Sequence, residues 1–340
     1  SAVADDFQAS IDGGDVAWET AIPVTPGIRT ASESILPGYT AGPWGGDCAD
    51  DGTVTVALGD DLTCTITNDD QAATLTLVKT VVNDNGGTAV ADDFQASVEG
   101  LPAGWGDPIA VVPGLHTASE STLPGYTAGP WGGDCAEDGT VTIALGDNLI
   151  CTITNDDKQA VLTLAKTVVN DNGGSAVADD FQASIDGGDV AWETAIPVTP
   201  GIRTASESIL PGYTAGPWGG DCADDGTVTV ALGDNLTCTI TNDDQAATLT
   251  LVKTVVNDNG GTAVADDFQA SVVGFPAPWG VPFDVFPGVH TASESNLPGY
   301  TAGPWGGDCA EDGTVTVALG DNLTCTITND DQAATLTLVK

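Results

Sequence analysis

The chain has 340 residues and a formal net charge of −42 at pH 7, with 7 Lys and Arg residues against 49 Asp and Glu residues. This charge excludes nucleic acids and anionic membrane surfaces as partners, because phosphate binding needs clustered Lys and Arg. No apolar run in the sequence reaches the length of a membrane-spanning helix.

The sequence repeats with a period of 87 residues, so that Phe7, Phe94 and Phe181 are equivalent. We therefore expect four tandem modules rather than one large domain. Modules one and three differ within their shared span only at Asp61, where module three has Asn235. The predicted boundaries are residues 1–70, 71–157, 158–244 and 245–331, followed by residues 332–340 as the first strand of a further module.

The pattern within a module is typical of an all-β, immunoglobulin-like sandwich. Short runs rich in Thr, Val and Ile alternate with clusters of Gly, Pro, Asn and Asp. A variable loop is predicted over residues 99–108. About seven strands would place the two ends of a module at opposite poles. In module two these strands are predicted at residues 74–82, 93–98, 109–112, 115–121, 125–128, 140–145 and 149–155.

The first predicted strand carries a lysine on its apolar face. Strand alternation in residues 74–82 puts Leu75, Leu77 and Lys79 on one side. Because the rest of the chain is poor in basic residues, we infer that the interior of each module requires an amine. Four of the five lysines occupy this position in successive repeats, namely Lys79, Lys166, Lys253 and Lys340.

The turn after this strand offers oxygen ligands of the kind that calcium prefers. Residues 83–87 read Asn-Asp-Asn-Gly-Gly, which is also an ordinary turn sequence. No cofactor is required by this pattern, and calcium is the one cofactor that it indicates. The calcium hypothesis names Asp84, Asp92, Asp93, Asp156 and Asp157 as ligands, together with their equivalents in the other repeats.

Each module has two cysteines that lie 16 residues apart. We expect the segment between them to fold back as a hairpin and bring them together in a disulfide, worth roughly 3 kcal/mol. Zinc is the alternative, but there is no CxxC pair and no histidine nearby. Disulfides indicate an oxidising, extracellular compartment. The predicted pairs are Cys48–Cys64, Cys135–Cys151, Cys222–Cys238 and Cys309–Cys325.

The later strands of a module add two more polar groups to the predicted core. In the last strand, alternation places Cys151, Ile153 and Asn155 on one face. In a middle strand, Glu120 lies on the side of Ala118. A lysine, a glutamate and an asparagine would then face one core, which is unfavourable unless they pair or react.

These motifs together resemble a known family. The motifs are Leu-x-Leu-x-Lys in the first strand, Asp-Asp-Phe opening the second, Gly-x-His/Arg-x-Ala-x-Glu before Leu-Pro-Gly-Tyr, and a closing Thr-Ile-Thr-Asn. All four recur in modules two, three and four, and module one has the last three. The pattern is similar to the collagen-adhesin B-type, prealbumin-like domains of bacterial pilins and surface adhesins, although that family is usually poor in cysteine. The resemblance covers each whole module.

The resemblance implies a spontaneous isopeptide bond between the lysine and the asparagine, with the glutamate as proton shuttle. Module one has Glu33 and Asn68 but no lysine of its own. The alternative is a hydrogen-bonded cluster that does not react. The implied sets are Lys79, Asn155 and Glu120; Lys166, Asn242 and Glu207; and Lys253, Asn329 and Glu294.

Burial disfavours the ammonium and the carboxylate as isolated charges, so a buried Lys–Glu couple can exist as a neutral amine and a neutral acid. The amine is then a nucleophile, and the acid polarises the amide and transfers protons while ammonia leaves. Each bond would make the chain about 17 Da lighter.

Lys340 has no asparagine after it, and Asn68 has no lysine before it. If copies assemble head to tail, residues 335–340 would complete module one of the next copy and join Lys340 to Asn68. The alternative is a continuous, longer array in which the same pairing occurs within one chain.

We therefore expect a structural subunit of an extracellular filament or cell-surface stalk, whose partners are further copies of itself. The alternative is a cell-surface adhesin that binds a ligand through the variable loops, residues 13–19, 99–108 and 274–282. An enzyme is not expected, because His116 occupies a position where other modules have Arg29 and Arg203. His290 occupies the same position in module four.

Overall fold

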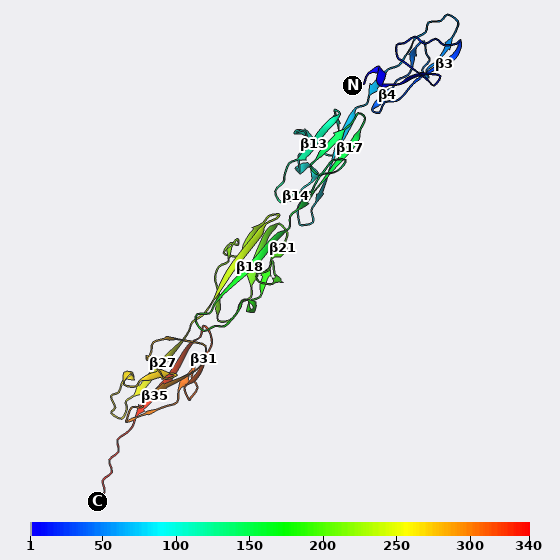
Figure 1. Ribbon diagram of the computed structural model, residues 1–340. Helices are drawn as coiled ribbons and strands as arrows, with labels where there is room; N and C mark the ends of the chain where they lie inside the picture. The colour runs from blue at the N-terminus through cyan, green and yellow to red at the C-terminus, as the bar shows by residue number, and fades with distance from the viewer. Residues whose placement is uncertain (1) are drawn as a thin grey trace. The chain divides into compact units, whose positions relative to one another are not determined.

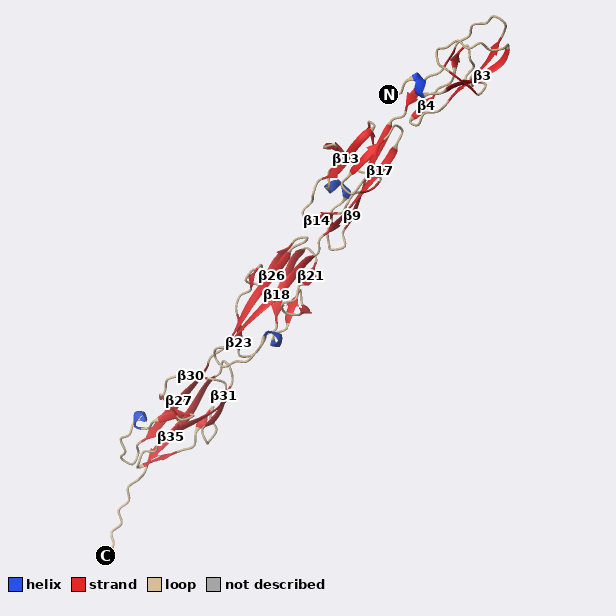
Figure 2. Ribbon diagram, in the orientation of Figure 1, coloured by secondary structure: helices blue, strands red, loops and turns tan. Residues whose placement is uncertain are grey.

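The computed structural model describes residues 2–340, which form short β-strands and four brief 3-10 helices (Figures 1 and 2). The chain divides into two compact units, residues 1–158 and 159–340. None of the helices in residues 2–340 is long and apolar enough to cross a membrane. The prediction of an all-β chain is confirmed.

Module two, in the first unit, shows the complete architecture. One sheet has the strand order β12-β9-β17-β14, with β15 also paired to β17, and the other has the order β11-β10-β13-β16. The elements are β9 (Ala73–Val82), η2 (Ala91–Asp93), β10 (Ala96–Val98), β11 (Leu101–Ala103), β12 (Pro108–Val111), β13 (Gly114–Glu120), β14 (Tyr126–Ala128), β15 (Gly132–Gly133), β16 (Thr140–Ile143) and β17 (Asn148–Asp157).

The first and last strands of this module are neighbours. β9 and β17 pair in parallel, from Thr74 opposite Asn148 to Val82 opposite Asp156. Because the two strands run in the same direction, the module begins at one end of this sheet and finishes at the other. The ends therefore lie at opposite poles, as expected, but the cause is the parallel pairing and not the number of strands.

Three details of the prediction for module two are wrong. The module has nine strands rather than seven, because β15 and β11 were not predicted. β11 lies inside the predicted loop 99–108 and pairs with β10. The second strand begins at Ala96 rather than Asp93, since Asp93 ends η2 and its carboxylate accepts a hydrogen bond from the Val90 N–H at 2.8 Å.

The core lies between the two sheets. Leu75 and Leu77 on β9 are 0% exposed, as their alternation predicts. They pack in one cluster with Val141 and Ile143 of β16, in the opposite sheet. Burial of a large aliphatic side chain contributes about 1.5–3 kcal/mol, so these alternating positions hold the two sheets together.

Modules three and four repeat this architecture, and the first strand of each again pairs in parallel with the last. Module three contains β18 (Ala160–Val169), η3 (Ala178–Asp180), β19 (Ala183–Ile185), β20 (Gly188–Val190), β21 (Ile196–Val198), β22 (Gly201–Glu207), β23 (Tyr213–Ala215), β24 (Gly219–Gly220), β25 (Thr227–Val230) and β26 (Asn235–Asp244). Module four contains β27 (Ala247–Val256), η4 (Ala265–Asp267), β28 (Ala270–Val272), β29 (Phe275–Ala277), β30 (Phe283–Val285), β31 (Gly288–Glu294), β32 (Tyr300–Ala302), β33 (Gly306–Gly307), β34 (Thr314–Val317) and β35 (Asn322–Asp331).

Module one is less complete. Its sheet β2-β1-β3-β6 matches the second sheet of the other modules, but its other sheet is reduced to the pairs β4-β8 and β5-β7. The described part of module one holds no strand in the position of β18. Its elements are η1 (Ala4–Asp6), β1 (Ala9–Ile11), β2 (Gly14–Val16), β3 (Gly27–Glu33), β4 (Tyr39–Ala41), β5 (Gly45–Gly46), β6 (Thr53–Val56), β7 (Cys64–Thr65) and β8 (Asn68–Asp70).

Candidate functional site

Each of the three complete modules buries a lysine against a glutamate. The Lys79 side chain is 0% exposed and the Glu120 side chain 7% exposed, and Lys79 Nζ contacts Glu120 Oε2. A buried ion pair is costly to desolvate, so its presence in every complete module marks a constrained site. The equivalent pairs are Lys166–Glu207 and Lys253–Glu294.

Strand alternation explains why this pair points inward. On β9, Lys79 continues the face of the fully buried Leu75 and Leu77. On β13, Glu120 follows the buried Ala118 by two residues. β9 and β13 belong to opposite sheets, so their inward-facing side chains meet in the core.

Asn155 lies on β17, beside the strand that carries the lysine. Lys79 is in register with Ile153, two residues before Asn155. Ile153 and Asn155 are 3% and 2% exposed, so both face the core. Lys79 and Asn155 are therefore diagonal neighbours on adjacent strands, a separation that a long side chain can bridge.

Two polar atoms of this cluster lack a hydrogen-bond partner within residues 2–340. They are Oε1 of Glu120 and Oδ1 of Asn155, and both are buried. An unsatisfied buried acceptor costs about 1–3 kcal/mol. The corresponding atoms in modules three and four share this condition. The three polar residues that strand alternation placed in the core, Lys79, Glu120 and Asn155, therefore form a buried cluster in which two acceptor atoms lack a hydrogen bond.

Aromatic rings close the site around the amine. Lys79 Nζ lies 4.2 Å from the ring centroid of Phe94 and 5.5 Å from that of Trp105. Trp105 stacks on Trp131 with centroids 6.3 Å apart, and its Nε1 donates a hydrogen bond to the Phe94 carbonyl oxygen at 2.7 Å. The rings exclude water from the amine and stabilise a cation when one is present.

The sequence analysis missed the role of this tryptophan, which lies in the predicted variable loop. The signal was present, because Trp105 recurs at the period of 87 residues although the residues around it differ. Its equivalents Trp192 and Trp279 approach Lys166 and Lys253 in the same way.

Burial lowers the pKa of the Lys79 amine below its usual value, although the hydrogen bond and the charge of Glu120 oppose this shift. The direction and the cause are the same for Lys166 and Lys253. A lower pKa raises the fraction of neutral amine, which is the nucleophilic form. The cluster therefore combines a nucleophile, a carboxyl group and a carboxamide.

All eight cysteines are paired in disulfides, and each pair is the one predicted. The predicted hairpin between the cysteines is wrong, because β16 and β17 belong to different sheets. Cys135 instead follows β15, whose Gly133 is in register with Cys151 on β17. This short pairing brings the two sulfur atoms together, and Cys151 is 0% exposed.

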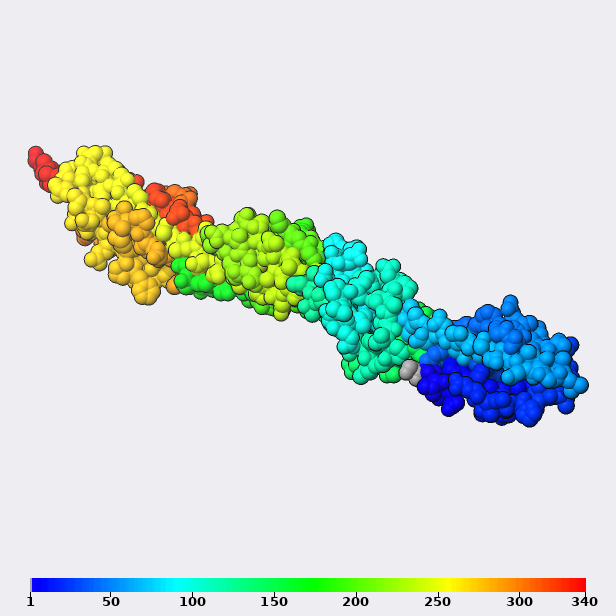
Figure 3. All heavy atoms as spheres, turned by 90° about the horizontal axis from the view of Figure 1, so that it is seen from above, coloured from blue at the N-terminus to red at the C-terminus, as the bar shows by residue number. Residues whose placement is uncertain are grey.

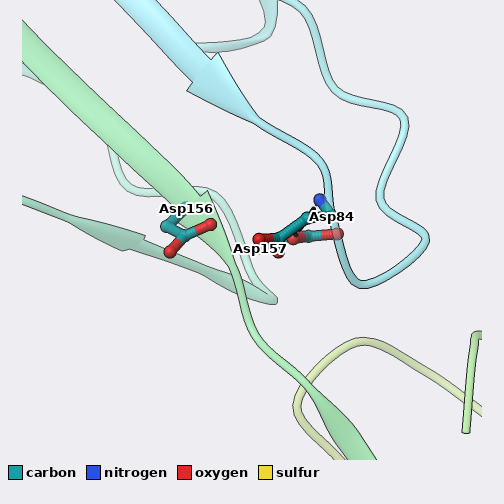
Figure 4. Close-up of side chains that lie close together, drawn as sticks. All are labelled: Asp84, Asp156 and Asp157. Atoms are coloured by element: carbon teal, nitrogen blue, oxygen red, sulfur yellow. Dashed lines mark hydrogen bonds between the residues drawn. The ribbon is translucent and has the colours of Figure 1, made fainter.

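The acidic residues proposed as calcium ligands are only partly brought together. Asp84, Asp156 and Asp157 each place a carboxylate oxygen within 4.8 Å of the others (Figure 4). Asp92 and Asp93 lie on η2 and are not members of this cluster. Equivalent clusters occur at Asp171, Asp243 and Asp244, and at Asp258, Asp330 and Asp331.

Asp157 has a structural role in this cluster. Its Oδ1 accepts a hydrogen bond from the Asp84 N–H at 3.0 Å, and its Oδ2 accepts one from the Gly87 N–H at 2.6 Å. Burial would raise the pKa of the Asp157 carboxyl, but these backbone donors and those of Asn85 outweigh it and hold the pKa below its usual value. Calcium binding stays a prediction, and the turn is organised by Asp157.

The two histidines occupy the structural position that arginine fills elsewhere. His116 Nε2 lies 2.7 Å from the Val112 carbonyl oxygen, four residues earlier. In module one, Arg29 Nε donates to the equivalent carbonyl oxygen of Thr25 at 2.9 Å. Both side chains therefore hold the loop before their own strand.

The two remaining predicted residues lie in different surroundings. Asn68 is half-buried in module one, and its Nδ2 donates a hydrogen bond to Glu33 Oε2 at 3.1 Å. Lys340 ends residues 332–340, which form no strand and are exposed (Figure 2). The carboxamide and the carboxyl group of module one are thus adjacent, and no lysine within residues 2–340 forms an ion pair with this carboxyl group.

Comparisons with known proteins agree with this architecture. The family model described as the prealbumin-like fold domain matches the chain four times, at residues 2–66, 70–153, 157–240 and 244–327. No curated protein sequence matches the chain.

Several solved structures resemble the chain at low identity. The Bacillus anthracis TIE protein is 13% identical, with a TM-score of 0.46, covering 97% of this chain and 76% of its own. The pilus adhesin SpaC from Lactobacillus rhamnosus GG, in its open conformation, is 14% identical, with a TM-score of 0.25, covering 83% of this chain and 46% of its own. Two B repeat units of the collagen binding protein of Staphylococcus aureus are 13% identical, with a TM-score of 0.18, covering 96% and 93%.

The fold assignment rests on the family match and on the sheet topology that recurs in modules two, three and four. The resemblance noted from the sequence motifs is therefore confirmed at the level of the family. The chain belongs to the family of prealbumin-like fold domains, of which it contains four in tandem.

Proposed function

We propose that the chain is a structural subunit of an extracellular filament or cell-surface stalk, and that its complete modules are cross-linked by internal isopeptide bonds. The observation that carries the proposal is the buried cluster of Lys79, Glu120 and Asn155, repeated in modules three and four. In this proposal copies of the chain join head to tail.

The proposed reaction needs only groups that the cluster contains. The neutral amine of Lys79 attacks Cγ of Asn155, and a C–N bond forms while the bond from Cγ to Nδ2 breaks. Glu120 takes a proton from the attacking nitrogen and delivers a proton to the leaving nitrogen, which departs as ammonia. The amide that forms carries no charge, so the reaction also removes the cost of a buried ammonium.

The extracellular location is supported by the four disulfides, since such bonds persist in oxidising compartments. A structural role is supported by the recurrence of one architecture with little variation. The two histidines do not favour a hydrolase, because His116 and His290 each bind the backbone carbonyl oxygen four residues earlier and so hold a loop in place.

Intact-mass measurement after reduction tests the cross-links. We expect a loss of about 17 Da for each bond relative to the reduced sequence mass, and three such losses for the three complete modules. Glu120→Gln should remove one loss, whereas Glu137→Gln, on an exposed turn, should remove none. A mass equal to that of the unreacted sequence would contradict the proposal.

Adhesion is a second candidate function, supported by two exposed apolar side chains in the variable loops. Leu101 is 72% exposed and Phe275 is 77% exposed, at equivalent positions of β11 and β29. Such residues are available to contact a ligand. Binding of a candidate ligand that Phe275→Ser abolishes, with fibre formation unchanged, would favour this function over the structural one.

Calcium at the acidic clusters is a separate proposal. Scanning calorimetry with a chelator and with added calcium tests it. If calcium binds, the melting temperature should be higher with added calcium than with the chelator. An unchanged melting curve would mean that Asp84 and Asp156 do not bind calcium.

A further inference from the structure

In module two the disulfide ends on the strand that carries the asparagine of the candidate site. Cys151 and Asn155 lie four residues apart on β17 and both face the core, at 0% and 2% exposure. Cys135, the partner of Cys151, is 7% exposed. Within the sheet, β17 lies between β9, which carries the lysine, and the strands β14 and β15. The disulfide therefore holds β17 on the side away from the lysine strand.

Residues 126–135, here called the covering segment, run antiparallel along β17. Ala128 on β14 is in register with Asn155, and Gly133 on β15 is in register with Cys151. The disulfide follows β15 directly and closes the end of this pairing. The covering segment therefore supports the backbone of Asn155 from the side opposite β9.

The covering segment also helps to close the site around the amine. It carries Trp131, which is 9% exposed and stacks on Trp105 with ring centroids 6.3 Å apart. Trp105 in turn has its ring centroid 5.5 Å from Lys79 Nζ. The equivalent tryptophan pairs of modules three and four stack in the same way. The segment that the disulfide holds thus reaches both reaction partners, one through β17 and the other through Trp105.

The sequence of the covering segment gives it little strand stability of its own. Residues 129–133 read Gly-Pro-Trp-Gly-Gly, and glycine and proline are unfavourable in strands. Gly133 has a φ of 73°, and a Cβ atom there would lie 2.3 Å from the Ile150 carbonyl oxygen, so the turn requires glycine. Pro130 and Asp134 are exposed, and the segment is part of the surface of module two, drawn from cyan to green in Figure 3. The disulfide is therefore the covalent restraint that keeps a weakly paired, solvent-exposed segment on β17.

We propose that the disulfide between Cys135 and Cys151 controls the cross-link of its module. It forms first and fixes the covering segment against β17, and only then does the amine of Lys79 react with Asn155. This inference rests on the proposed function and makes the two cysteines positioning residues that act through the covering segment. Closing a loop of this size raises the population of the closed segment on the order of 100-fold. The same order of events applies in modules three and four.

The two steps balance separately. In the first, the thiols of Cys135 and Cys151 lose two protons and two electrons to an external disulfide oxidant, which is reduced to two thiols. In the second, the C–N bond forms and ammonia leaves, with no exchange of electrons. The cross-link is not itself an oxidation, yet it would form only where an oxidant is present. A chain in a reducing compartment would keep its lysines free and its modules unlocked.

The order of the two steps can be tested on the unaltered chain. The chain is synthesised in a cell-free system with a reductant and transferred to oxidised glutathione, and thiols are blocked with iodoacetamide at intervals. Peptides of module two with both cysteines alkylated should contain free Lys79, whereas disulfide-bonded peptides should acquire the loss of about 17 Da. Chains kept in reductant should react about 100-fold more slowly. Alkylated peptides in which Lys79 is joined to Asn155 as often as in disulfide-bonded ones would overturn the proposal.

Variants separate positioning from simple stabilisation. Replacing Cys135 and Cys151 with alanine should slow the mass loss of module two about 100-fold, while modules three and four of the same chain react at their usual rate. Ile143→Ala is the matched control, because Ile143 is 2% exposed on β16, in the sheet that does not contain the covering segment. Its truncation destabilises the core, but the rate in the folded fraction should change little.

Hydrogen exchange of β9 and β17 gives the folded fraction of module two in each variant. Equal slowing by Ile143→Ala in that fraction would mean that the disulfide only stabilises the fold, which overturns its positioning role. If the variant without cysteines does not fold, the alkylation experiment still decides the order of the steps, because it uses the unaltered chain.

The outcomes separate this inference from the proposed function. Losses of about 17 Da that appear equally fast with and without the disulfide would overturn the control by oxidation and leave the cross-links standing. The absence of any loss, in oxidised and reduced chains alike, would overturn both. A loss that appears only after oxidation, in each of the three complete modules, is the result we expect.

Discussion

Modules one and three have the same sequence apart from Asp61 and Asn235, yet they differ in structure. In module three, Trp192 and Val198 are 8% and 9% exposed. Their equivalents in module one are Trp18, which is half-buried, and Val24, which is 38% exposed. One strand accounts for the difference, because module three contains β18 and the described part of module one has no equivalent. The core of module three is therefore completed by its own first strand.

The comparison also separates local from long-range effects. The Asp12–Arg29 ion pair of module one is preserved as Asp186–Arg203 in module three, at 2.9 and 3.0 Å. The disulfide is likewise formed in both modules. Module one differs from module three in two features. Its last strand is divided into β7 and β8, and it has no counterpart of the buried Lys166–Glu207 ion pair among its described residues. In module three both features involve β18, which pairs with the last strand and carries Lys166.

The largest expected effect comes from removing the amine of module three. Lys166→Met leaves Glu207 buried without its partner, which should lower the free energy of unfolding of this module by about 3–5 kcal/mol. The loss of the cross-link adds to this effect. Calorimetry of the chain would show it, with Lys158→Met as control, because Lys158 is exposed. An unchanged melting profile would mean that the buried pair does not stabilise module three.

The disulfides should contribute a similar amount in both modules. Replacing Cys222 and Cys238 with alanine should lower the free energy of unfolding by roughly 3 kcal/mol, because the loop has the same 16-residue separation as that of Cys48 and Cys64. Denaturant titration of each double variant measures the two costs. A much smaller cost in module one would show that its open core limits the benefit of the bond.

A smaller effect is expected at the turn held by an aspartate. Asp244 is 3% exposed, and backbone donors hold the pKa of its carboxyl below the usual value despite burial. A lowered pKa contributes stability above the unfolded-state pKa, and this stability is lost as the pH falls through the folded-state pKa. Asp244→Asn should therefore cost about 1.5–3 kcal/mol at neutral pH and progressively less in acid.

The control for that change is the equivalent residue of module one. Asp70 is exposed, so Asp70→Asn should have an effect within about 0.5 kcal/mol at any pH. Thermal melts of both variants between neutral and acidic pH would measure the difference. A cost for Asp244→Asn that does not diminish in acid would contradict the role assigned to its charge.

The smallest effect should follow from the substitution that makes the shared sequence of modules one and three identical. Asp61→Asn changes an exposed residue, and we expect a change in stability of less than about 0.5 kcal/mol. Hydrogen exchange of module one should also stay unchanged. If this substitution protected the amides of β7 and β8, the difference between the modules would lie in sequence and not in the strand.

Much of the site could be predicted from the sequence, because period-two alternation places side chains by local rules. Lys79 and Asn155 are core-facing for this reason, and the repeat showed that their positions are constrained. The pairing of strands could not be predicted in the same way. β16 was expected to turn back onto β17, but it pairs with β13 in the other sheet, and only the folded chain selects between these partners.

The elements that were missed have weak local signals. β11 contains Pro102, which argues against a strand in an interior position and is tolerated here at the edge of the sheet. Trp105 lies in a stretch of variable sequence, and its role depends on the lysine that it covers from another strand. The composition around these residues is typical of a loop. Only the recurrence of Trp105 at the period of 87 residues indicated that this stretch has a structural role.

The parallel pairing of β9 with β17 has a mechanical consequence. A pull on the two ends of module two would act along both strands in opposite directions, since the chain enters through one and leaves through the other. The hydrogen bonds of that ladder would then be loaded in shear and share the tension, instead of opening one after another as in a peeled hairpin. A covalent link from Lys79 to Asn155 would transmit the force directly from β9 to β17. The rest of the module would then stay folded under tension.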